Sequence, residues 1–208
     1  MKVLLVNGSP RPAGCTYTAL CEIAKTLDEV GVQSEIFQLG NKPVRDCIAC
    51  RGCVGKGKCV FGDEDVVNAL IQKAQDSDGF VFGSPVYFAH PTGLLLSVLD
   101  RAFYAGKTAF MHKPGAAIVS ARRGGTAASF DVINKYFTIS QMPIVSSTYW
   151  NMVYGTKPDE VLRDEEGMQT MHNIAKNMAY LLQCIDAGEK AGVKKPEIVS
   201  SVRTNFIR

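Results

Sequence analysis

The chain has 208 residues, of which 46% are hydrophobic and 21% charged, and its net charge is +3. These values are typical of one globular domain, and the charge is too small to indicate binding to nucleic acid or to an anionic membrane. The N-terminus lacks the basic segment and apolar run of a signal peptide, and no apolar stretch reaches the ~18 residues of a membrane span. We therefore expect a cytoplasmic protein with reduced thiols and without nucleic-acid or membrane partners.

Short apolar runs alternate along the chain with stretches whose apolar residues recur at helical spacing. We predict strands at residues 2–6, 33–39, 79–83, 115–120 and 143–147. We predict helices at residues 16–30, 63–74, 91–104, 125–137 and 165–187. This alternation indicates a parallel sheet covered on both faces, and five strands suit the flavodoxin-like, doubly wound order 2-1-3-4-5 in a three-layer α/β/α fold. The domain is expected to cover residues 1–188, followed by a polar C-terminal extension at residues 189–208.

The loop after the first strand, from Gly8 to Thr16, has the composition of an anion-binding site. Such a glycine-rich turn leads into a helix N-terminus, which offers unpaired backbone N–H groups and the positive end of the helix dipole. Ser9 and Thr16 can add hydroxyl donors, and Arg11 can offset negative charge. Neither the dinucleotide pattern G-x-G-x-x-G nor the Walker A pattern G-x-x-x-x-G-K-[ST] occurs in this loop, so we predict a site for a terminal monophosphate.

The loops after the third and fourth strands should meet this site, because ligands of doubly wound sheets bind beyond the carboxyl ends of the strands. Their backbone groups and aromatic side chains can meet the edge and the face of a flat ring. Pro85 restricts the backbone φ angle in the loop after the third strand. Arg122 or Arg123 can add positive charge in the loop after the fourth strand. The candidate ligand-binding residues of the two loops are Pro85, Val86, Tyr87, Phe88, Ser120, Gly124 and Gly125.

Four cysteines gather between residues 45 and 62 in the pattern C-x2-C-x2-C-x5-C. They are Cys47, Cys50, Cys53 and Cys59. The short gaps let one loop direct several sulfurs at one centre, and the glycines permit the left-handed turns that this requires. Neighbouring lysines and arginines favour thiolates and offset the charge of a negative cluster. From the residues alone, the loop can hold an iron–sulfur cluster, carry structural or redox thiols, or bind zinc.

Two of these segments resemble the NADPH-dependent FMN reductase family, namely G-S-P-R…G-C-T after the first strand and S-P-V-Y after the third. The cysteine spacing and its place after the second strand resemble the iron–sulfur flavoprotein branch of that family. The resemblance implies flavin mononucleotide (FMN), with its phosphate held by Ser9, Arg11 and Thr16, and with Cys15 where the family usually has Ser or Asn. It also implies a [4Fe–4S] cluster on the four cysteines, near a flavin at a subunit interface, and a homodimer or homotetramer.

The resemblance further implies that loop 85–88 wraps the flavin ring and that Gly124 and Gly125 lie near its pyrimidine side. With the cluster, single electrons would pass between flavin and cluster. Without it, the flavin would take hydride from NAD(P)H and reduce free flavin, a quinone or a protein acceptor, with no amino-acid nucleophile. Asp100 and Arg101, which resemble the family's L-D-R, are expected to form a structural ion pair.

Two other functions stay open at this point. The first is a non-catalytic flavodoxin-type electron carrier, against which the net charge of +3 and the cysteine loop argue. The second is a metal-sensing or scaffold protein that uses only the cysteines. Purified protein that gains no flavin spectrum on addition of FMN would favour the second.

Overall fold

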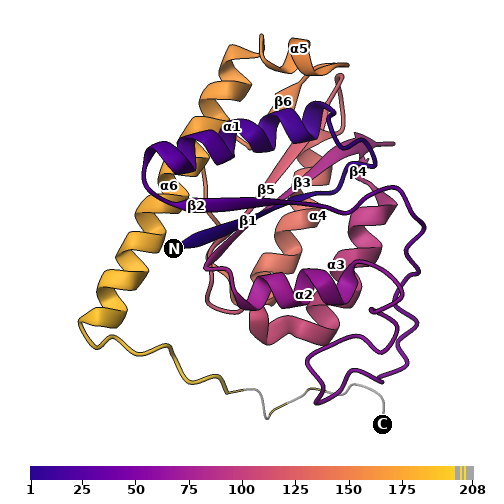
Figure 1. Cartoon of the computed structure of the whole chain (residues 1–208), viewed down its shortest axis with the longest axis vertical. Helices are drawn as coiled ribbons and strands as arrows, with labels where there is room; N and C mark the ends of the chain where they lie inside the picture. Colours follow the sequence, from indigo (N-terminus) through magenta and orange to yellow (C-terminus); the bar gives the residue numbers. More distant parts are fainter. Residues whose placement is uncertain (200–201, 203, 205–208) are drawn as a thin grey trace.

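A mostly parallel sheet lies between two layers of helices in the computed structural model, which describes residues 1–199, 202 and 204 (Figure 1). The parallel strands lie in the order β2-β1-β3-β5-β6, and β4 pairs antiparallel with β3. Their bounds are Lys2–Asn7 for β1, Gln33–Gln38 for β2, Gly79–Tyr87 for β3, His90–Pro91 for β4, Gly115–Ala121 for β5 and Met152–Tyr154 for β6. The predicted flavodoxin-like α/β class is confirmed, with six strands in place of five because of the short β4.

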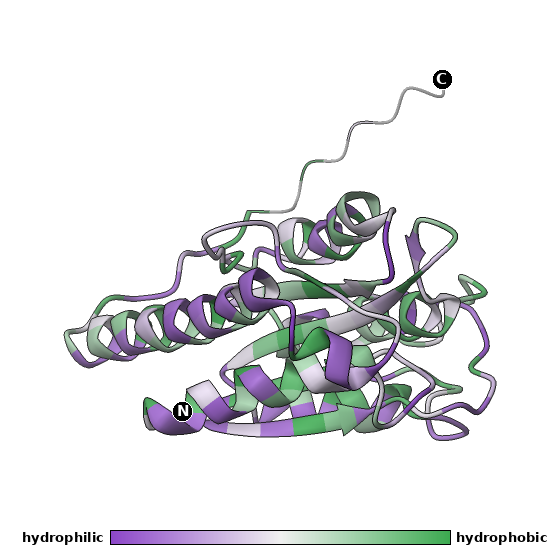
Figure 2. Cartoon of the chain, turned by 90° about the horizontal axis from the view of Figure 1, so that it is seen from above, coloured by the Kyte–Doolittle hydropathy of each residue, from purple (hydrophilic) through white to green (hydrophobic). Residues whose placement is uncertain are grey.

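The helices divide between the two faces of the sheet (Figure 1). On one face lie α1 (Cys15–Glu29), α5 (Pro158–Val161) and α6 (Glu165–Lys190). On the other lie α2 (Val67–Gln75), α3 (Gly93–Gly106) and α4 (Thr126–Ile139), and a 3-10 turn, η1 (Lys107–Ala109), follows α3. Hydrophilic and hydrophobic residues alternate along these helices (Figure 2), as expected for helices that cover a sheet with one apolar side.

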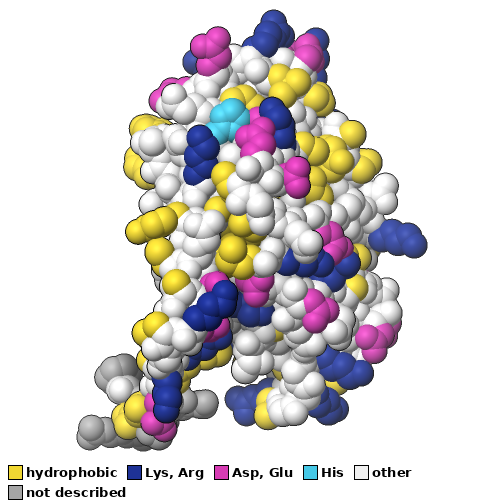
Figure 3. Space-filling model, turned by 60° about the vertical axis from the view of Figure 1, so that its left-hand side comes forward, with side chains coloured by type: hydrophobic (Ala, Val, Ile, Leu, Met, Phe, Trp, Pro, Cys, Tyr) yellow, Lys and Arg dark blue, Asp and Glu magenta, His cyan; other side chains and the backbone are white. Residues whose placement is uncertain are grey.

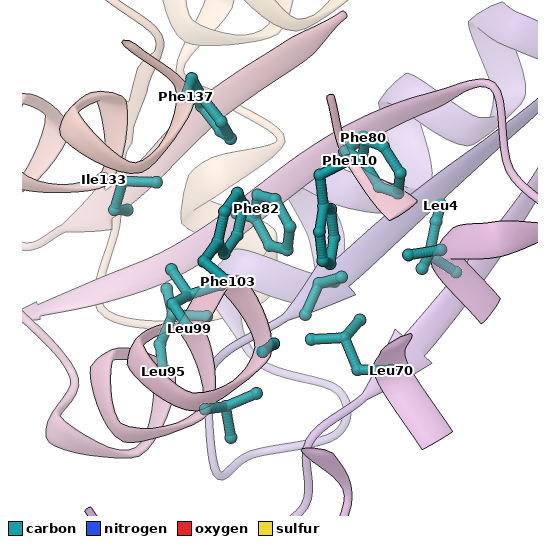
Figure 4. Packing of buried hydrophobic residues seen from close by; sticks show 14 of the residues in the cluster. Leu4, Leu70, Phe80, Phe82, Leu95, Leu99, Phe103, Phe110, Ile133 and Phe137 are labelled. Atoms are coloured by element: carbon teal, nitrogen blue, oxygen red, sulfur yellow. The ribbon is translucent and has the colours of Figure 1, made fainter. Parts of the chain in front are cut away.

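The alternation of side chains along the strands builds two separate cores. In β1, Val3 and Leu5 contact the layer of α1 and α6, whereas Leu4 and Val6 contact the layer of α2, α3 and α4. The core beside α2, α3 and α4 is rich in aromatic side chains. Among them, the rings of Phe103 and Phe110 stack with centroids 4.3 Å apart (Figure 4). Both faces of β1 are therefore buried, which explains why this strand is a continuous apolar run.

The predicted fifth strand at residues 143–147 is wrong in its position. Only Ile144 pairs with the sheet there, through one bridge to Gly115, and the fifth parallel strand is β6. Between these two pairings the chain leaves the sheet and returns to it. The Ser147 hydroxyl donates to the carbonyl oxygen of Thr170 in α6 at 2.8 Å, and the Asn151 side chain donates to the carbonyl oxygen of Ala117 in β5 at 2.9 Å, just before β6 begins.

Three helix ends also differ from the prediction. Helix α2 begins at Val67 rather than at residue 63, because the Asp65 carboxylate accepts the Val67 N–H at 3.0 Å and leaves residues 63–66 as turns. Helix α3 begins after Thr92, whose hydroxyl accepts the Leu95 N–H, and the preceding proline belongs to β4. Helix α6 continues to Lys190, and the predicted extension at residues 189–208 lies partly outside the described residues.

Charged side chains of both signs are interspersed on the side of the molecule that carries α6, and a histidine lies among them (Figure 3). Glu22 of α1 accepts a hydrogen bond from the Nε2 atom of His172 of α6 at 2.5 Å. This bond, with Lys25 3.6 Å away, lowers the pKa of the Glu22 carboxyl below its usual range. The bond between the two helices therefore adds stability only while Glu22 is ionised.

We expect Glu22→Gln to lower the free energy of unfolding at neutral pH and to lose this effect in acid. A carboxyl with a lowered pKa stabilises the fold above its unfolded pKa of about 4.3, and the contribution disappears as the pH falls through the folded pKa. Urea unfolding of both proteins at pH 7 and near pH 3 measures the difference. A gap of the same size at both pH values would contradict the role of this ion pair.

Candidate functional site

The loop between β1 and α1 is held against β3 by close backbone contacts. The Gly8 N–H donates to the carbonyl oxygen of Gly83 at 2.8 Å, and the Thr92 hydroxyl donates to the carbonyl oxygen of Gly8, also at 2.8 Å. A Cβ atom at Gly8 would lie 2.8 Å from the same Gly83 oxygen, so only glycine fits. The glycine therefore fixes where the loop leaves the sheet.

Within this loop, groups suited to an anion point toward the start of α1. The Ser9 hydroxyl accepts the Arg11 N–H at 3.1 Å, which leaves the hydroxyl hydrogen available for a ligand. Gly14 precedes α1 as its N-cap, and no side chain among the described residues caps this helix. Its first N–H groups and the positive end of its dipole are therefore available to a phosphate.

A cavity of about 260 Å³ lies over this loop at the carboxyl ends of the strands. The Thr16 and Ser120 hydroxyls lie 2.8 Å apart and join the first turn of α1 to the end of β5. Eight of the predicted cofactor residues line the cavity, and they are Ser9, Arg11, Cys15, Thr16, Pro85, Val86, Tyr87 and Ser120. Arg122 lines it as well, whereas Arg123 does not.

Three predicted cofactor residues do not line this cavity. Phe88 is fully exposed at the turn between β3 and β4, with a left-handed φ of 52°. Gly125 precedes α4 with a φ of 91°, and its α-carbon packs against Ala89 of that same turn. Gly124 beside it has open space around it. These residues lie where the β3–β4 turn meets the start of α4, outside the cavity.

Sequence reasoning missed the residues that the loop after β6 contributes, Gly155 and Thr156. The rule that ligands bind beyond the carboxyl ends of strands includes this loop only when the fifth strand is placed correctly, and the prediction places it too early in the chain. Gly155 also contacts Cys15, the residue that stands where the family usually has Ser or Asn. The Cys15 thiol donates to the carbonyl oxygen of Gly155 at 3.6 Å. Burial raises the pKa of the Cys15 thiol, so it stays neutral and does not repel a phosphate.

Gln38, at the end of β2, supports the phosphate loop from the side. Its side-chain nitrogen donates to the carbonyl oxygen of Ser9 at 2.7 Å, and its side-chain oxygen accepts the Asn7 amide at 2.5 Å. The Asn7 side chain in turn accepts the Ser9 N–H at 3.1 Å. These bonds hold the loop open before any ligand binds.

We expect Gln38→Ala to weaken FMN binding about fivefold, which is about 1 kcal/mol for a lost pair of hydrogen bonds that pre-organise the loop. Gln33→Ala at the exposed start of the same strand serves as the matched control. Quenching of FMN fluorescence on titration with each protein gives the dissociation constants. Equal constants for the two variants would rule out this supporting role.

The cysteine loop follows β2 and lies beside α3 (Figure 1). The backbone of Ala49 and Arg51 adopts left-handed φ angles of 51° and 58°, which turn the chain between successive cysteines. The four cysteines line one small pocket together with Arg101 and Tyr104 of α3. Among the described residues, no three histidine, cysteine or acidic side chains are grouped closely enough to hold a single metal ion.

Two side chains attach the last cysteine of the loop to the fold. The side-chain oxygen of Asn68 accepts the Cys59 N–H and its nitrogen donates to the Cys59 carbonyl oxygen, both at 2.9 Å. Arg101 donates to the Cys59 sulfur from Nε and from Nη2, each at 3.4 Å. The expected ion pair between Asp100 and Arg101 is wrong. Arg101 pairs with Asp65, and Asp100 accepts the Tyr136 hydroxyl instead.

The residues of both sites suit the groups that the sequence predicts for them. The phosphate loop offers hydroxyl, backbone and guanidinium donors, which are the groups that bind a phosphate. In the cysteine loop, four thiols share one pocket with a buried guanidinium. Each cysteine of a four-iron cluster binds a different iron, so its sulfurs can lie further apart than the ligands of one ion. No helix in the described part of the chain is long and apolar enough to cross a membrane.

Comparison with known proteins identifies the family. Residues 1–157 match the family model of NADPH-dependent FMN reductase. An iron–sulfur flavoprotein of Methanocaldococcus jannaschii is 30% identical over 194 residues, covering 89% of this chain and 99% of that protein. A second iron–sulfur flavoprotein of the same organism is 31% identical over 200 residues, covering 88% and 98%.

Solved structures show the same fold at low sequence identity. RosB with a bound flavin-phosphate intermediate has a TM-score of 0.68 at 13% identity and covers 100% of this chain and 92% of its own. The apo form of an NADH:FMN oxidoreductase has a TM-score of 0.62 at 16% identity, with 86% and 89% covered. Because the family model and both relatives match most of its length, the chain belongs to the NADPH-dependent FMN reductase family, in its iron–sulfur flavoprotein branch.

Proposed function

We propose that this protein is an FMN-dependent oxidoreductase that takes electrons from NAD(P)H and exchanges them with a [4Fe–4S] cluster bound by its cysteine loop. The observation that carries the proposal is the presence of two sites on one fold. A cavity with phosphate-binding groups lies at the carboxyl ends of the strands, and four thiols share a pocket beside α3. The family supports a flavin oxidoreductase, and the relatives carry the name iron–sulfur flavoprotein.

The residues of the phosphate loop would hold FMN and exclude water from its phosphate. Ser9, Thr16 and the N–H groups that begin α1 would donate to the phosphate oxygens, and Arg11 would offset their charge. Pro85 to Tyr87 and Ala121 would contact the flavin ring along the cavity. When bound, the flavin supplies hydride acceptance and the cluster supplies single-electron transfer, and the protein supplies orientation and charge.

The four cysteines would each bind one iron of the cluster. Two features support a cluster over zinc. The pattern is a single run rather than two separated pairs, and a buried guanidinium lies against one of the sulfurs. A cationic donor beside the sulfur suits a negatively charged cluster, because it offsets charge that burial makes costly.

We further propose that the protein acts in the cytoplasm as a homodimer or homotetramer, with a small molecule or a protein as its electron acceptor. Tyr149 and Trp150 support self-association, since both are about half exposed and their ring centroids lie 5.3 Å apart. The resemblance to iron–sulfur flavoproteins implies that in such an assembly the cluster lies near a flavin at the subunit interface.

The test is an anaerobic reaction of the purified protein with NADH and with NADPH. We expect bleaching of the flavin absorption by at least one of the two, followed by return of the colour when a quinone or free flavin is added. Protein that stays fully coloured with both nucleotides, yet is reduced by dithionite, would favour a non-catalytic electron carrier and would contradict the proposed reaction.

A further inference from the structure

We propose that Arg101 is a positioning residue for the iron–sulfur cluster, which directs two N–H groups at the sulfur of Cys59 and thereby raises the reduction potential of the cluster. The inference rests on the proposed function, because it requires that the cysteine loop holds a cluster. It concerns a residue of α3, far from the cysteines in sequence, whose side chain is only 2% exposed.

The geometry around the guanidinium assigns each of its sides a partner. Nε and Nη2 donate to the Cys59 sulfur at 3.4 Å each, as a fork on one acceptor. Nη1 donates to the Asp65 carboxylate and, at 3.1 Å, to the carbonyl oxygen of Arg45. Asp65 therefore fixes the orientation of the guanidinium plane. The edge that carries Nε and Nη2 then faces the sulfur of Cys59.

One side of α3 carries the cysteine loop over several turns. Ser97 donates to the Asp46 carboxylate, Arg101 contacts Cys59, and Tyr104 lines the cysteine pocket, so the contacts recur at helical spacing. The same helix begins at Thr92, whose hydroxyl bonds Gly8 of the phosphate loop. A rigid helix thus holds the cysteine loop and the phosphate loop at a fixed separation.

Hydrogen bonds to ligand sulfurs stabilise the more negative, reduced state of an iron–sulfur cluster, and so they raise its reduction potential. A positive charge held next to the sulfur acts in the same direction. Lysine at this position would keep the charge but present no planar fork, so it could not place two N–H groups on one sulfur while bonding Asp65. Arg101 therefore acts on the reduction potential in two ways, through its positive charge and through its two hydrogen bonds. A substitution that keeps the charge and removes the hydrogen bonds separates the two contributions.

The test compares Arg101→Lys with Arg163→Lys in the full chain, purified anaerobically. Both changes keep the charge, but Arg163 is exposed and lies outside the cysteine pocket, whereas Arg101 is buried against Cys59. Redox titration followed by electron paramagnetic resonance gives the cluster potential, and iron analysis gives its content. We expect a shift to more negative potential in Arg101→Lys and an unchanged potential in Arg163→Lys.

A second variant, Arg101→Gln combined with Asp65→Asn, decides the matter if Arg101→Lys does not fold. It removes both members of the ion pair, so no buried charge is left unpaired and the net charge near the sulfur is kept, but it removes the fork on Cys59, so we expect a shift to more negative potential. A potential equal to that of the wild type in Arg101→Lys, or in the double variant where Arg101→Lys does not fold, with full iron content, would overturn the inference and leave the proposed function intact. A wild type that holds no iron would overturn the proposed function itself.

Discussion

We expect Cys50→Ala to lose its iron almost completely while it still binds FMN. Cys50 lies between two left-handed residues in the middle of the cysteine run, and its side chain is exposed. Under the proposed function, its loss therefore removes one iron ligand and no packing. A four-iron cluster without its fourth thiolate has an iron open to water and oxygen, which breaks the cluster down. Iron should fall from about four atoms per chain to near zero.

The matched control for this variant is Cys184→Ala. Cys184 is also exposed, but it lies in α6, outside the cysteine loop. The control should keep the iron and sulfide content of the wild type, measured by colorimetric assay on anaerobically purified protein. Both variants should bind FMN as the wild type does, because neither cysteine lines the cavity over the phosphate loop. Equal iron in the two variants would show that the loop does not hold the cluster.

The second large effect is expected at Gly125. Its φ of 91° is unfavourable for any residue with a side chain, and a Cβ atom there would lie 2.5 Å from the α-carbon of Ala89. Alanine at this position must therefore push the turn between β3 and β4 away from α4. Strain of this kind costs about 1–3 kcal/mol, and the same displacement moves the turn that directly follows the cavity residues Pro85 to Tyr87.

The neighbouring glycine provides the control. A Cβ atom at Gly124 would meet no other atom within 4 Å, and the φ of this residue is not left-handed, so Gly124→Ala should unfold at the same urea concentration as the wild type. Gly125→Ala should unfold at a lower concentration and bind FMN more weakly, as followed by circular dichroism and flavin fluorescence. Equal midpoints for the two variants would mean that the contact with Ala89 does not constrain the turn.

Local patterns predict most of the fold and most of the cavity. The run Val3 to Val6 is apolar at every position because both faces of β1 are buried, and this signal needs no knowledge of the rest of the chain. The glycines and hydroxyls of the phosphate loop are likewise close together in sequence, so their shared role follows from their spacing. The cavity residues Pro85 to Tyr87 and Ser120 follow from the rule about the carboxyl ends of strands, applied to loops recognised by composition.

Contacts between distant segments cannot be predicted in this way. Arg101 and Asp65 are 36 residues apart, and their pairing depends on where α2 begins, which itself depends on the Asp65 side chain. The fifth strand is predicted too early because an apolar strand-like segment joins the sheet through a single bridge, from Ile144 to Gly115, and then leaves it. Nothing in the local composition indicates that Ser147 bonds to α6 instead.

The most direct measurement of the central claim is an anaerobic reductive titration that counts electrons. Protein that carries one FMN and one [4Fe–4S] cluster per chain takes up about three electrons per chain, two at the flavin and one at the cluster. We predict about three electron equivalents for the wild type and about two for Cys50→Ala. An uptake of about two in the fully loaded wild type would contradict the claim that this chain joins a flavin to an iron–sulfur cluster.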